Sequence, residues 1–322
     1  MAKYNFFFLN ELGQKELNNF YSSSFLKDSL IDPLYSKLSQ EFYSSYNGSS
    51  WEDVSVAASY EGSIIGYIIA KVNNGQASYF NFPIYIHIDE NLPDTTEVYK
   101  SLFSFFLDNL TLLHISNILV DSHFFKYSSQ FHLNTSKELQ IAYINLQDPL
   151  DLIKRNIRKS YKSFINWGEK NFNFITIDKK NLDRDLFKRF MLFHHHVSGR
   201  ITRSEETWNI QYKMIKASEA FAVIAFFEDK MIGGLLIIHS DYEAYYAVGV
   251  YDRDLMQSGI PVAHSMLFKA ISIAKKLNVQ SFILGDVSFS NSTKEQNIAK
   301  FKLGFAKGII NKSYYIINTH SV

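Results

Sequence analysis

The chain has 322 residues, of which 46% are hydrophobic and 20% are charged, and its formal net charge is +1. This length suits two globular domains of about 150 residues each, and the composition excludes a disordered chain. The near-neutral charge excludes a general attraction to nucleic acid or anionic membranes, and the absence of cysteine excludes a disulfide framework, a thiolate zinc site and a cysteine nucleophile.

Three strands joined by turns are predicted first along the chain, over residues 54–60, 64–72 and 77–88. Glu61-Gly62-Ser63 and Asn73-Asn74-Gly75-Gln76 separate them, and turn residues between β-branched and aromatic runs indicate hairpins. A helix over residues 95–110 follows, and then a strand that ends at Asp121.

A helical stretch rich in lysine and arginine, Asp148 to Lys170, is predicted next. Lys154, Arg158 and Lys162 recur in it at helical spacing, which puts them on one positive face. We expect Arg158 and Lys162 to contact a phosphate-bearing substrate at the junction between two modules. The alternative is a charged face that serves only solubility.

Three consecutive histidines, His194-His195-His196, lie on a predicted helix that Arg200 and Arg203 follow. Consecutive helical residues point about 100° apart, so the histidines cannot share one ion and no metal site is expected. An arginine pair can hold a carboxylate or a phosphate, which makes Arg203 a candidate substrate-binding residue. A plain surface role is the alternative for each of these residues.

The C-terminal half repeats the order of elements, with strands over 221–227, 231–239 and 244–251, a helix over 261–277 and a strand ending at Asp286. Residues of the two meanders match at a constant offset of 167, and the next strands match at 165. The matched pairs of the meanders are Glu61 and Glu228, Ile65 and Ile232, Gly66 and Gly233, Ala77 and Ala244, and Tyr79 and Tyr246. We therefore predict an α/β (α+β) chain of two tandem modules, residues 1–149 and 150–322, each a mixed and mostly antiparallel sheet flanked by helices.

Four stretches of the C-terminal half carry a resemblance to a known fold. They are Leu152 to Ile165, Gly249-Val-Tyr-Asp-Arg253 with Pro261 and its helix, Phe282-Ile-Leu-Gly-Asp286, and Ile298-Ala-Lys-Phe-Lys-Leu-Gly-Phe305. In this order they resemble the GNAT acyltransferase fold, and most closely the FemAB-like group, in which two such modules sit in tandem. Before residue 150 the likeness is architectural. The resemblance implies that the C-terminal module is the catalytic one, that the N-terminal module is degenerate, and that the central strands part near Gly285.

The resemblance also places the candidate cofactor-binding residue. A GNAT that uses acetyl-CoA carries a Q/R-x-x-G-x-G/A loop whose backbone N–H groups hold the pyrophosphate. Gln257-Ser258-Gly259-Ile260-Pro261-Val262 stands at that position, so Gly259 is the candidate. Pro261 replaces the second glycine and has no N–H to donate, and Lys300 stands where many GNATs have a general-acid tyrosine.

Lys302 and Asp286 are the candidate catalytic residues. The lysine of the FK-x-GF motif, here Lys302, is implied to stabilise the charge that develops during acyl transfer. Asp286, at a predicted strand end, is suited to orient or deprotonate the attacking amine. The alternatives are a solvated helix lysine and a turn former. Tyr246 and Tyr251 are candidate substrate contacts, although core packing is the default, and strand alternation puts Tyr246 on one face and Tyr245 with Tyr251 on the other.

The sequence lacks the motifs of serine hydrolases, P-loop NTPases and dinucleotide-binding enzymes, and it has no uninterrupted apolar run of about 18 residues. We expect a cytoplasmic protein without a membrane span or a DNA partner. The resemblance implies an N-acyltransferase that joins an acyl group to an amine of a cell-envelope precursor, such as a peptidoglycan stem lysine or a nucleotide-linked amino sugar. The donor is acyl-CoA or acetyl-CoA, and the alternatives are aminoacyl-tRNA as donor or a binding module without activity.

Overall fold

The structure is a computed structural model that describes residues 4–48, 50–126, 133–288 and 292–319. The chain divides into two compact units, each discontinuous in sequence. Unit 1 contains residues 1–30, 47–138 and 312–322, and unit 2 contains residues 31–46 and 139–311. The modules expected from the sequence, 1–149 and 150–322, are instead continuous, so each unit also includes a segment from the other expected module.

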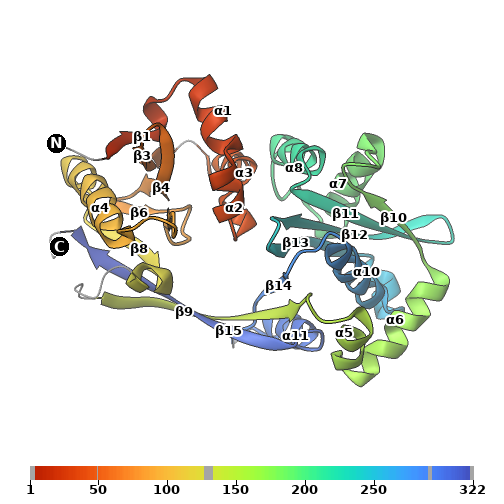
Figure 1. The fold of residues 1–322 in the computed structure, drawn as a ribbon. Coiled ribbons are helices and arrows are strands. Elements are labelled where there is room, and N and C mark those ends of the chain that lie inside the picture. Colours follow the sequence, from red (N-terminus) through yellow and green to blue (C-terminus); the bar gives the residue numbers. More distant parts are fainter. Residues whose placement is uncertain (1–3, 49, 127–132, 289–291, 320–322) are drawn as a thin grey trace. The chain divides into compact units, whose positions relative to one another are not determined.

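Unit 1 consists of two sheets with one long helix (Figure 1). Its elements are β1 (Asn5–Phe8), η1 (Leu9–Glu11), α1 (Gln14–Ser22), α2 (Ser24–Ser29), β2 (Glu52–Asp53), β3 (Val56–Tyr60), β4 (Ser63–Ile69), β5 (Lys71–Asn73), β6 (Gln76–Ser78), β7 (Tyr85–Ile88), α4 (Thr95–Leu112), β8 (Asn117–Asp121), η3 (Ser122–Lys126) and the last part of β15 (Gly308–Asn318). The first sheet has the order β1-β3-β4-β7, and the strands β15-β8-β6-β5-β2 follow one another as part of a second, longer sheet. Val98, Leu102 and Phe106 of α4 are buried in the core of this unit.

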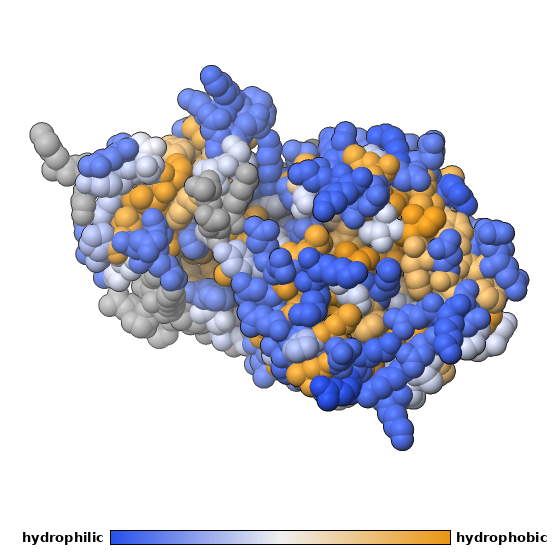
Figure 2. Space-filling view, turned by 45° about the vertical axis from the view of Figure 1, so that its right-hand side comes forward, coloured by the Kyte–Doolittle hydropathy of each residue, from blue (hydrophilic) through white to orange (hydrophobic). Residues whose placement is uncertain are grey.

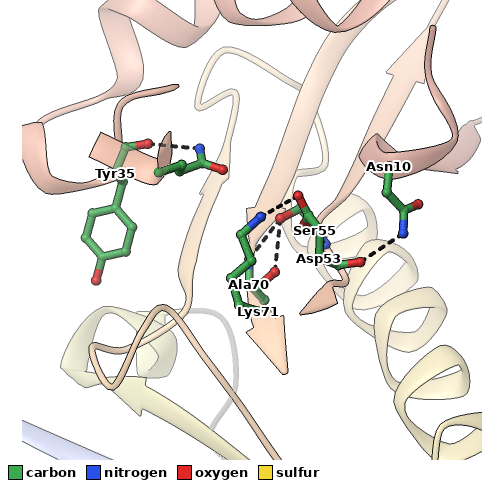
Figure 3. Close-up of polar contacts among 7 residues, drawn as sticks. Asn10, Tyr35, Asp53, Ser55, Ala70 and Lys71 are labelled. Atoms are coloured by element: carbon green, nitrogen blue, oxygen red, sulfur yellow. Dashed lines mark hydrogen bonds and ion pairs between the residues drawn. The ribbon is translucent and has the colours of Figure 1, made fainter. Parts of the chain in front are cut away.

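A buried ion pair lies where the chain passes from β4 to β5 in unit 1. Lys71 is 7% exposed, and its ammonium donates to the carboxylate of Asp53 (Figure 3). The main chain of Asp53 accepts a hydrogen bond from Asn10, and Ser55 bonds both backbone groups of Ala70. A buried lysine is tolerated because its charge has this partner.

Unit 2 is built around a single mixed sheet. Its elements are η2 (Pro33–Tyr35), α3 (Lys37–Asn47), the last part of β9 (Leu133–Asn145), α5 (Leu150–Asn156), α6 (Lys159–Asn171), β10 (Asn173–Ile177), α7 (Arg184–Ser198), α8 (Glu205–Ala217), β11 (Ala220–Phe227), β12 (Lys230–His239), β13 (Glu243–Tyr251), α9 (Arg253–Gln257), α10 (Val262–Lys276), β14 (Ser281–Asp286), α11 (Thr293–Leu303) and the first part of β15. The strands follow the order β10-β11-β12-β13-β14-β9, and only β13 and β14 pair in parallel.

Helices cover both faces of the sheet of unit 2, and two consecutive glycines of β12 let them approach closely. A Cβ at Gly233 would lie 2.6 Å from the sulfur of Met266 in α10, and one at Gly234 would lie 2.3 Å from the ring of Phe190 in α7. Because neighbouring residues of a strand point to opposite faces, α10 lies on one face and α7 on the other.

The predicted fold class and its repeat are confirmed. In unit 1, Gln76 and Ala77 of β6 pair in parallel with β8, and in unit 2 Glu243 to Tyr245 of β13 pair in parallel with β14. The strand expected over 77–88 is wrong as a single strand, because the chain forms β6 and β7 instead. Phe80 and Asn81 between them adopt positive φ, which a continuous strand cannot contain.

The helix expected through Leu152 to Ile165 is broken at Ile157 and Arg158, which have extended ψ angles of 145° and 133°. Ile157 is 2% exposed, and the N–H of Arg158 donates to the carbonyl of Gly304 at 2.9 Å. Burial of the isoleucine and this hydrogen bond stabilise the break. The prediction of one helical face shared by Lys154, Arg158 and Lys162 is therefore wrong, since α5 carries the first and α6 begins after the second.

No helix in the described ranges is both long and apolar enough to cross a membrane. Figure 2 shows apolar patches interrupted by hydrophilic residues on the visible surface. Phe164 and Trp167 of α6 are each 38% exposed.

Candidate functional site

The parallel strands β13 and β14 part after three residue pairs, as predicted. They pair from Glu243 with Ser281 to Tyr245 with Ile283, and beyond this point Gly285 and Asp286 pair only with β9. Each of the two strands also has a register shift against its other neighbour near this point. Ala247 of β13 has no partner on β12, and Leu284 of β14 has none on β9. Bulges of this kind bend a strand and increase its twist, which separates two strands that began side by side.

Lys302 of α11 lies at this parting. Its ammonium donates to the carbonyl of Asp286 at 3.1 Å. Gly285 has φ of +90°, and a Cβ built there would lie 3.2 Å from the Lys302 Nζ and 3.8 Å from the Tyr245 hydroxyl. The glycine thus lets an ammonium and a phenol lie beside the same peptide. Burial lowers the pKa of Lys302, and the nearby Asp286 carboxylate acts in the opposite direction.

Tyr245 brings further titratable groups to the same place. Burial raises the pKa of its phenol, with smaller effects from the carboxylates of Asp32 and Asp286. Burial also raises the pKa of Tyr43, with contributions from Tyr245 and Asp32. We call Tyr245, Gly285, Asp286 and Lys302 the splay site, and Asp32 and Tyr43 flank it. Phenols and an ammonium whose pKa values are shifted by burial are typical of functional sites.

Sequence reasoning placed Tyr245 on the strand of Tyr246 and Tyr251 without choosing it as a site residue, and it did not point to Asp32 or Tyr43. Asp32 and Tyr43 belong to residues 31–46, which were expected in the N-terminal module but lie in unit 2. No local signal marks them, because their role depends on contacts with residues about 200 positions away.

The Asp286 carboxylate holds the turn after β14. Its Oδ1 accepts hydrogen bonds from the N–H of Ser288 at 2.9 Å, from the Ser288 hydroxyl, and from the N–H of Gln140 at 3.3 Å. These bonds hold the carboxylate in place at the exposed end of the strand.

Tyr246 and Tyr251 meet each other on the face of the sheet that carries α10. Their hydroxyl oxygens are 2.9 Å apart, and both rings pack against the core that contains Met266 and Phe268. The prediction that they point to opposite faces is wrong, because the bulge at Ala247 shifts the alternation by one residue. Burial raises the pKa of both phenols.

The backbone amides of the loop before α10 form hydrogen bonds within that loop. Gly259 is exposed with φ of +84°, and its N–H donates to the Met256 carbonyl at 3.1 Å. The N–H groups of Ile260 and Val262 donate to Leu255 and Ile260 at 3.0 and 2.9 Å. Gly259 therefore helps to end α9, and these amides are engaged within the loop.

His264, in the first turn of α10, lies among aromatic rings of α6 and the α11 region. Its ring centroid is 4.4 Å from Tyr161, 4.9 Å from Phe164, 5.2 Å from Phe301 and 6.2 Å from Phe305. Burial lowers the pKa of His264 to about 4. The imidazole is therefore neutral at pH 7, and the start of α10 is covered by α6.

The basic candidates of α5, of α6 and of the break between them are partly engaged in local contacts. Arg158 donates to the Tyr161 hydroxyl at 3.2 Å, beside the end of α11. Lys162 donates to the Arg155 carbonyl at 2.6 Å, and Lys154 forms a 3.0 Å ion pair with Glu169. Arg158 lies near the helix that carries Lys302, whereas Lys162 closes over the end of α5.

Arg203 is stacked on Trp208 of α8. Its guanidinium carbon is 3.8 Å from the indole centroid and 5.7 Å from the ring of Phe42 in α3. Nε and Nη2 are buried without a hydrogen-bond partner among the described residues. Burial lowers the pKa of Arg203 to about 10, so the side chain stays charged at neutral pH. One planar edge of a charged guanidinium is thus left for an anion with two oxygens.

Within the described ranges, no group of three or more histidine, cysteine, aspartate or glutamate side chains is arranged to hold a metal ion. His194 and His195 instead lie around Trp208, with ring centroids 5.3 and 6.2 Å from it.

Neither a protein-family model nor a curated protein matches the chain. Solved structures do match over nearly the whole length. FemX covers 97% of this chain and 96% of its own at 11% identity, with a TM-score of 0.69. A tandem GNAT protein from the clavulanic acid biosynthesis pathway covers 98% of both chains at 8% identity (TM-score 0.53), and L-PGS from Bacillus licheniformis covers 89% of this chain and 92% of its own at 12% identity (TM-score 0.54). The chain therefore has the tandem GNAT fold that FemX shares.

Proposed function

We propose that this chain, with its tandem GNAT fold, is an N-acyltransferase that joins an acyl group from an activated donor to an amine of a cell-envelope precursor. A nucleotide-linked amino sugar and a peptidoglycan precursor are the acceptors we propose. The observation that carries the proposal is the parting of β13 and β14 beside the Lys302 ammonium. We also propose that unit 2, which contains these strands, is the catalytic part and that the protein works in the cytoplasm.

The proposed reaction is direct attack of the acceptor amine on the donor carbonyl. A C–N bond forms, an oxyanion develops on the former carbonyl oxygen, and the C–S or C–O bond to the carrier then breaks. Lys302 stabilises the oxyanion, which is favourable because its buried ammonium is already in place before the reaction. The Asp286 carboxylate takes the proton from the attacking nitrogen and the leaving thiolate or alkoxide finally receives it.

Binding of the two substrates is assigned to the remaining candidates. Arg203 holds a phosphate or carboxylate of the acceptor through its unpartnered Nε and Nη2. Arg158 contributes positive charge near α11 and Lys162 contributes it over the end of α5, while Tyr246 with Tyr251 borders the acyl group. Gly259 remains the candidate contact for acyl-CoA or acetyl-CoA.

A second donor, aminoacyl-tRNA, is favoured by a specific observation. The amides of Gly259, Ile260 and Val262 are engaged within the loop, Pro261 has none, and His264 lies under Tyr161 and Phe164 of α6. A pyrophosphate bound at the start of α10, as in GNATs that use CoA, would have to displace these contacts. An aminoacyl ester has no pyrophosphate and places no such demand.

The test is amide formation by the purified chain, followed by mass spectrometry, with acyl-CoA or charged tRNA as donor and a nucleotide-linked amino sugar or peptidoglycan precursor as acceptor. Loss of product after RNase treatment identifies the tRNA donor. Lys302→Met should lower turnover about 10²–10³-fold, because the oxyanion loses its charged partner. Lys300→Met is the matched control on the same helix, since Lys300 is exposed and should leave turnover near wild type. Equal turnover in both variants would remove Lys302 from the mechanism, and absence of product from every donor would indicate a binding module without activity.

A further inference from the structure

Several buried polar atoms around Trp208 have no hydrogen-bond partner in the part of the chain that the structure describes. They are Nε and Nη2 of Arg203, Nδ1 of His194, Nε2 of His195, Nε1 of Trp208 and Oε1 of Gln211. Trp208 is 2% exposed and Gln211 is 3% exposed, so neither side chain is freely hydrated. Buried polar groups are nearly always paired in native proteins, so a group of atoms without protein partners is a place where an ion, a ligand or ordered water can bind.

Three of these side chains, Arg203, His194 and His195, gather around the Trp208 indole. The Arg203 guanidinium stacks on it at 3.8 Å, and the rings of His194 and His195 approach it at 5.3 and 6.2 Å. We call Arg203, His194, His195, Trp208 and Gln211 the Arg203 cluster. With the exception of the Gln211 oxygen, its unpaired atoms are donors or imidazole nitrogens that donate in one tautomer or when protonated. A ligand rich in acceptor oxygens therefore suits it.

The charge of the cluster is also unbalanced. No carboxylate is among the groups that act on the pKa of Arg203, which responds to burial and to Tyr46 of α3. Burial first, then Arg203 and then His195, lower the pKa of His194 to about 4, so His194 is neutral at pH 7. An anion bound to Arg203 would cancel the repulsion from the guanidinium and attract a proton, which moves the pKa of His194 upward.

We propose that His194 is a specificity-determining residue of the Arg203 cluster. When a dianionic phosphate group binds to Arg203, His194 takes up a proton, and the cluster thereby favours phosphate over carboxylate. A carboxylate carries one charge, which Arg203 alone balances. A phosphate dianion carries a second, and the imidazolium of His194 meets it with a charge-assisted hydrogen bond. This inference rests on the proposed function only in assigning the phosphate to the acceptor.

Sulfate is the probe, because it has the shape of a phosphate dianion and does not itself take up a proton near neutral pH. Calorimetric titration of the full chain with sulfate at pH 7, in buffers of different ionisation enthalpy, measures proton uptake directly. We expect an uptake approaching one proton for each sulfate bound. Acetate, a monoanion, should bind at least about tenfold more weakly and take up much less.

His194→Asn tests the residue, because its amide keeps a polar group near the position of Nδ1 but cannot become cationic. We expect sulfate affinity to fall about tenfold, proton uptake to vanish, and acetate binding to change less than about twofold. His196→Asn is the matched control, since His196 is exposed on the same helix and lies outside the cluster. It should retain wild-type affinity and uptake.

Sulfate binding without proton uptake by the wild type, or unchanged uptake in His194→Asn, would overturn the proposal. The wild-type titration decides the matter even if His194→Asn does not fold. Neither measurement involves acyl transfer, so an inactive chain that binds sulfate with proton uptake would contradict the proposed function and leave this inference standing.

Discussion

At the scale of single residues, His264 couples folding to pH. Its folded-state pKa is about 4, because the rings of Tyr161 and Phe164 and their neighbours exclude water, whereas an unfolded histidine has a pKa near 6.5. Between these values the unfolded chain binds a proton that the folded chain does not. The stabilising contribution is therefore complete above about pH 6.5 and is lost as the pH falls toward 4. His194 acts in the same direction.

We predict that His264→Phe reduces the acid sensitivity of the fold. Phenylalanine suits the aromatic surroundings and has no proton to gain. Between pH 7 and pH 5 the variant should lose about 1 kcal/mol less unfolding free energy than wild type, after allowance for partial exposure. Urea denaturation at the two pH values measures this. His196→Phe, at an exposed position, should behave as wild type, and an equal loss in His264→Phe would contradict the assignment.

At the scale of elements, α6 lies close to α10 because a glycine faces a serine. A Cβ at Gly168 would lie 2.2 Å from Ser265 Oγ and 2.5 Å from its Cβ, so the helices touch without an intervening side chain. The same closeness brings Tyr161 and Phe164 over His264, and with it the proposed cover over the start of α10.

Gly168→Ala should destabilise the protein by about 1–3 kcal/mol, although alanine is the better helix former by about 1 kcal/mol. The added methyl group forces α6 away from α10. Chemical denaturation measures the change, and Ser163→Ala, exposed on the same helix, should stay within about 0.5 kcal/mol of wild type. A stabilised Gly168→Ala would mean that the helices are farther apart than described.

At the scale of the whole molecule, unit 2 depends on segments that precede residue 150. Strand β9 pairs with β14 through Ile141 to Asn145, and in residues 31–46 the Ser36 hydroxyl donates to Glu219 at 2.7 Å. We predict that residues 150–322 alone do not unfold cooperatively. In this fragment β14 would present an unpaired edge, and Arg203 would lose its contact with the ring of Phe42. Thermal unfolding by circular dichroism, with the full chain as control, checks this, and one sharp transition in the fragment would contradict it.

The sequence by itself determined what local patterns encode, which is the repeated meander and the helix and strand that follow it. Lys302 was singled out by the resemblance of its FK-x-GF segment, and its approach to Gly285 came from the structure. Alternation and turn residues depend on neighbours in the chain, so the fold class followed from them. The short interruptions did not follow from the sequence. The bulge at Ala247 and the break at Ile157 each cost little conformational free energy locally and are stabilised by packing against distant residues.

Only the tertiary structure decided which side chains share a site. Tyr245 and Lys302 lie beside the same peptide at Gly285, and Arg203 lies against Trp208 beside the histidines, through packing that residue spacing in the sequence does not predict. The sequence also did not predict that residues 31–46 belong to unit 2. The composition of a segment shows that it will be buried, but it does not show against which sheet. Hydrophobic burial is non-directional, and it is the shape of the assembled core that selects the partner.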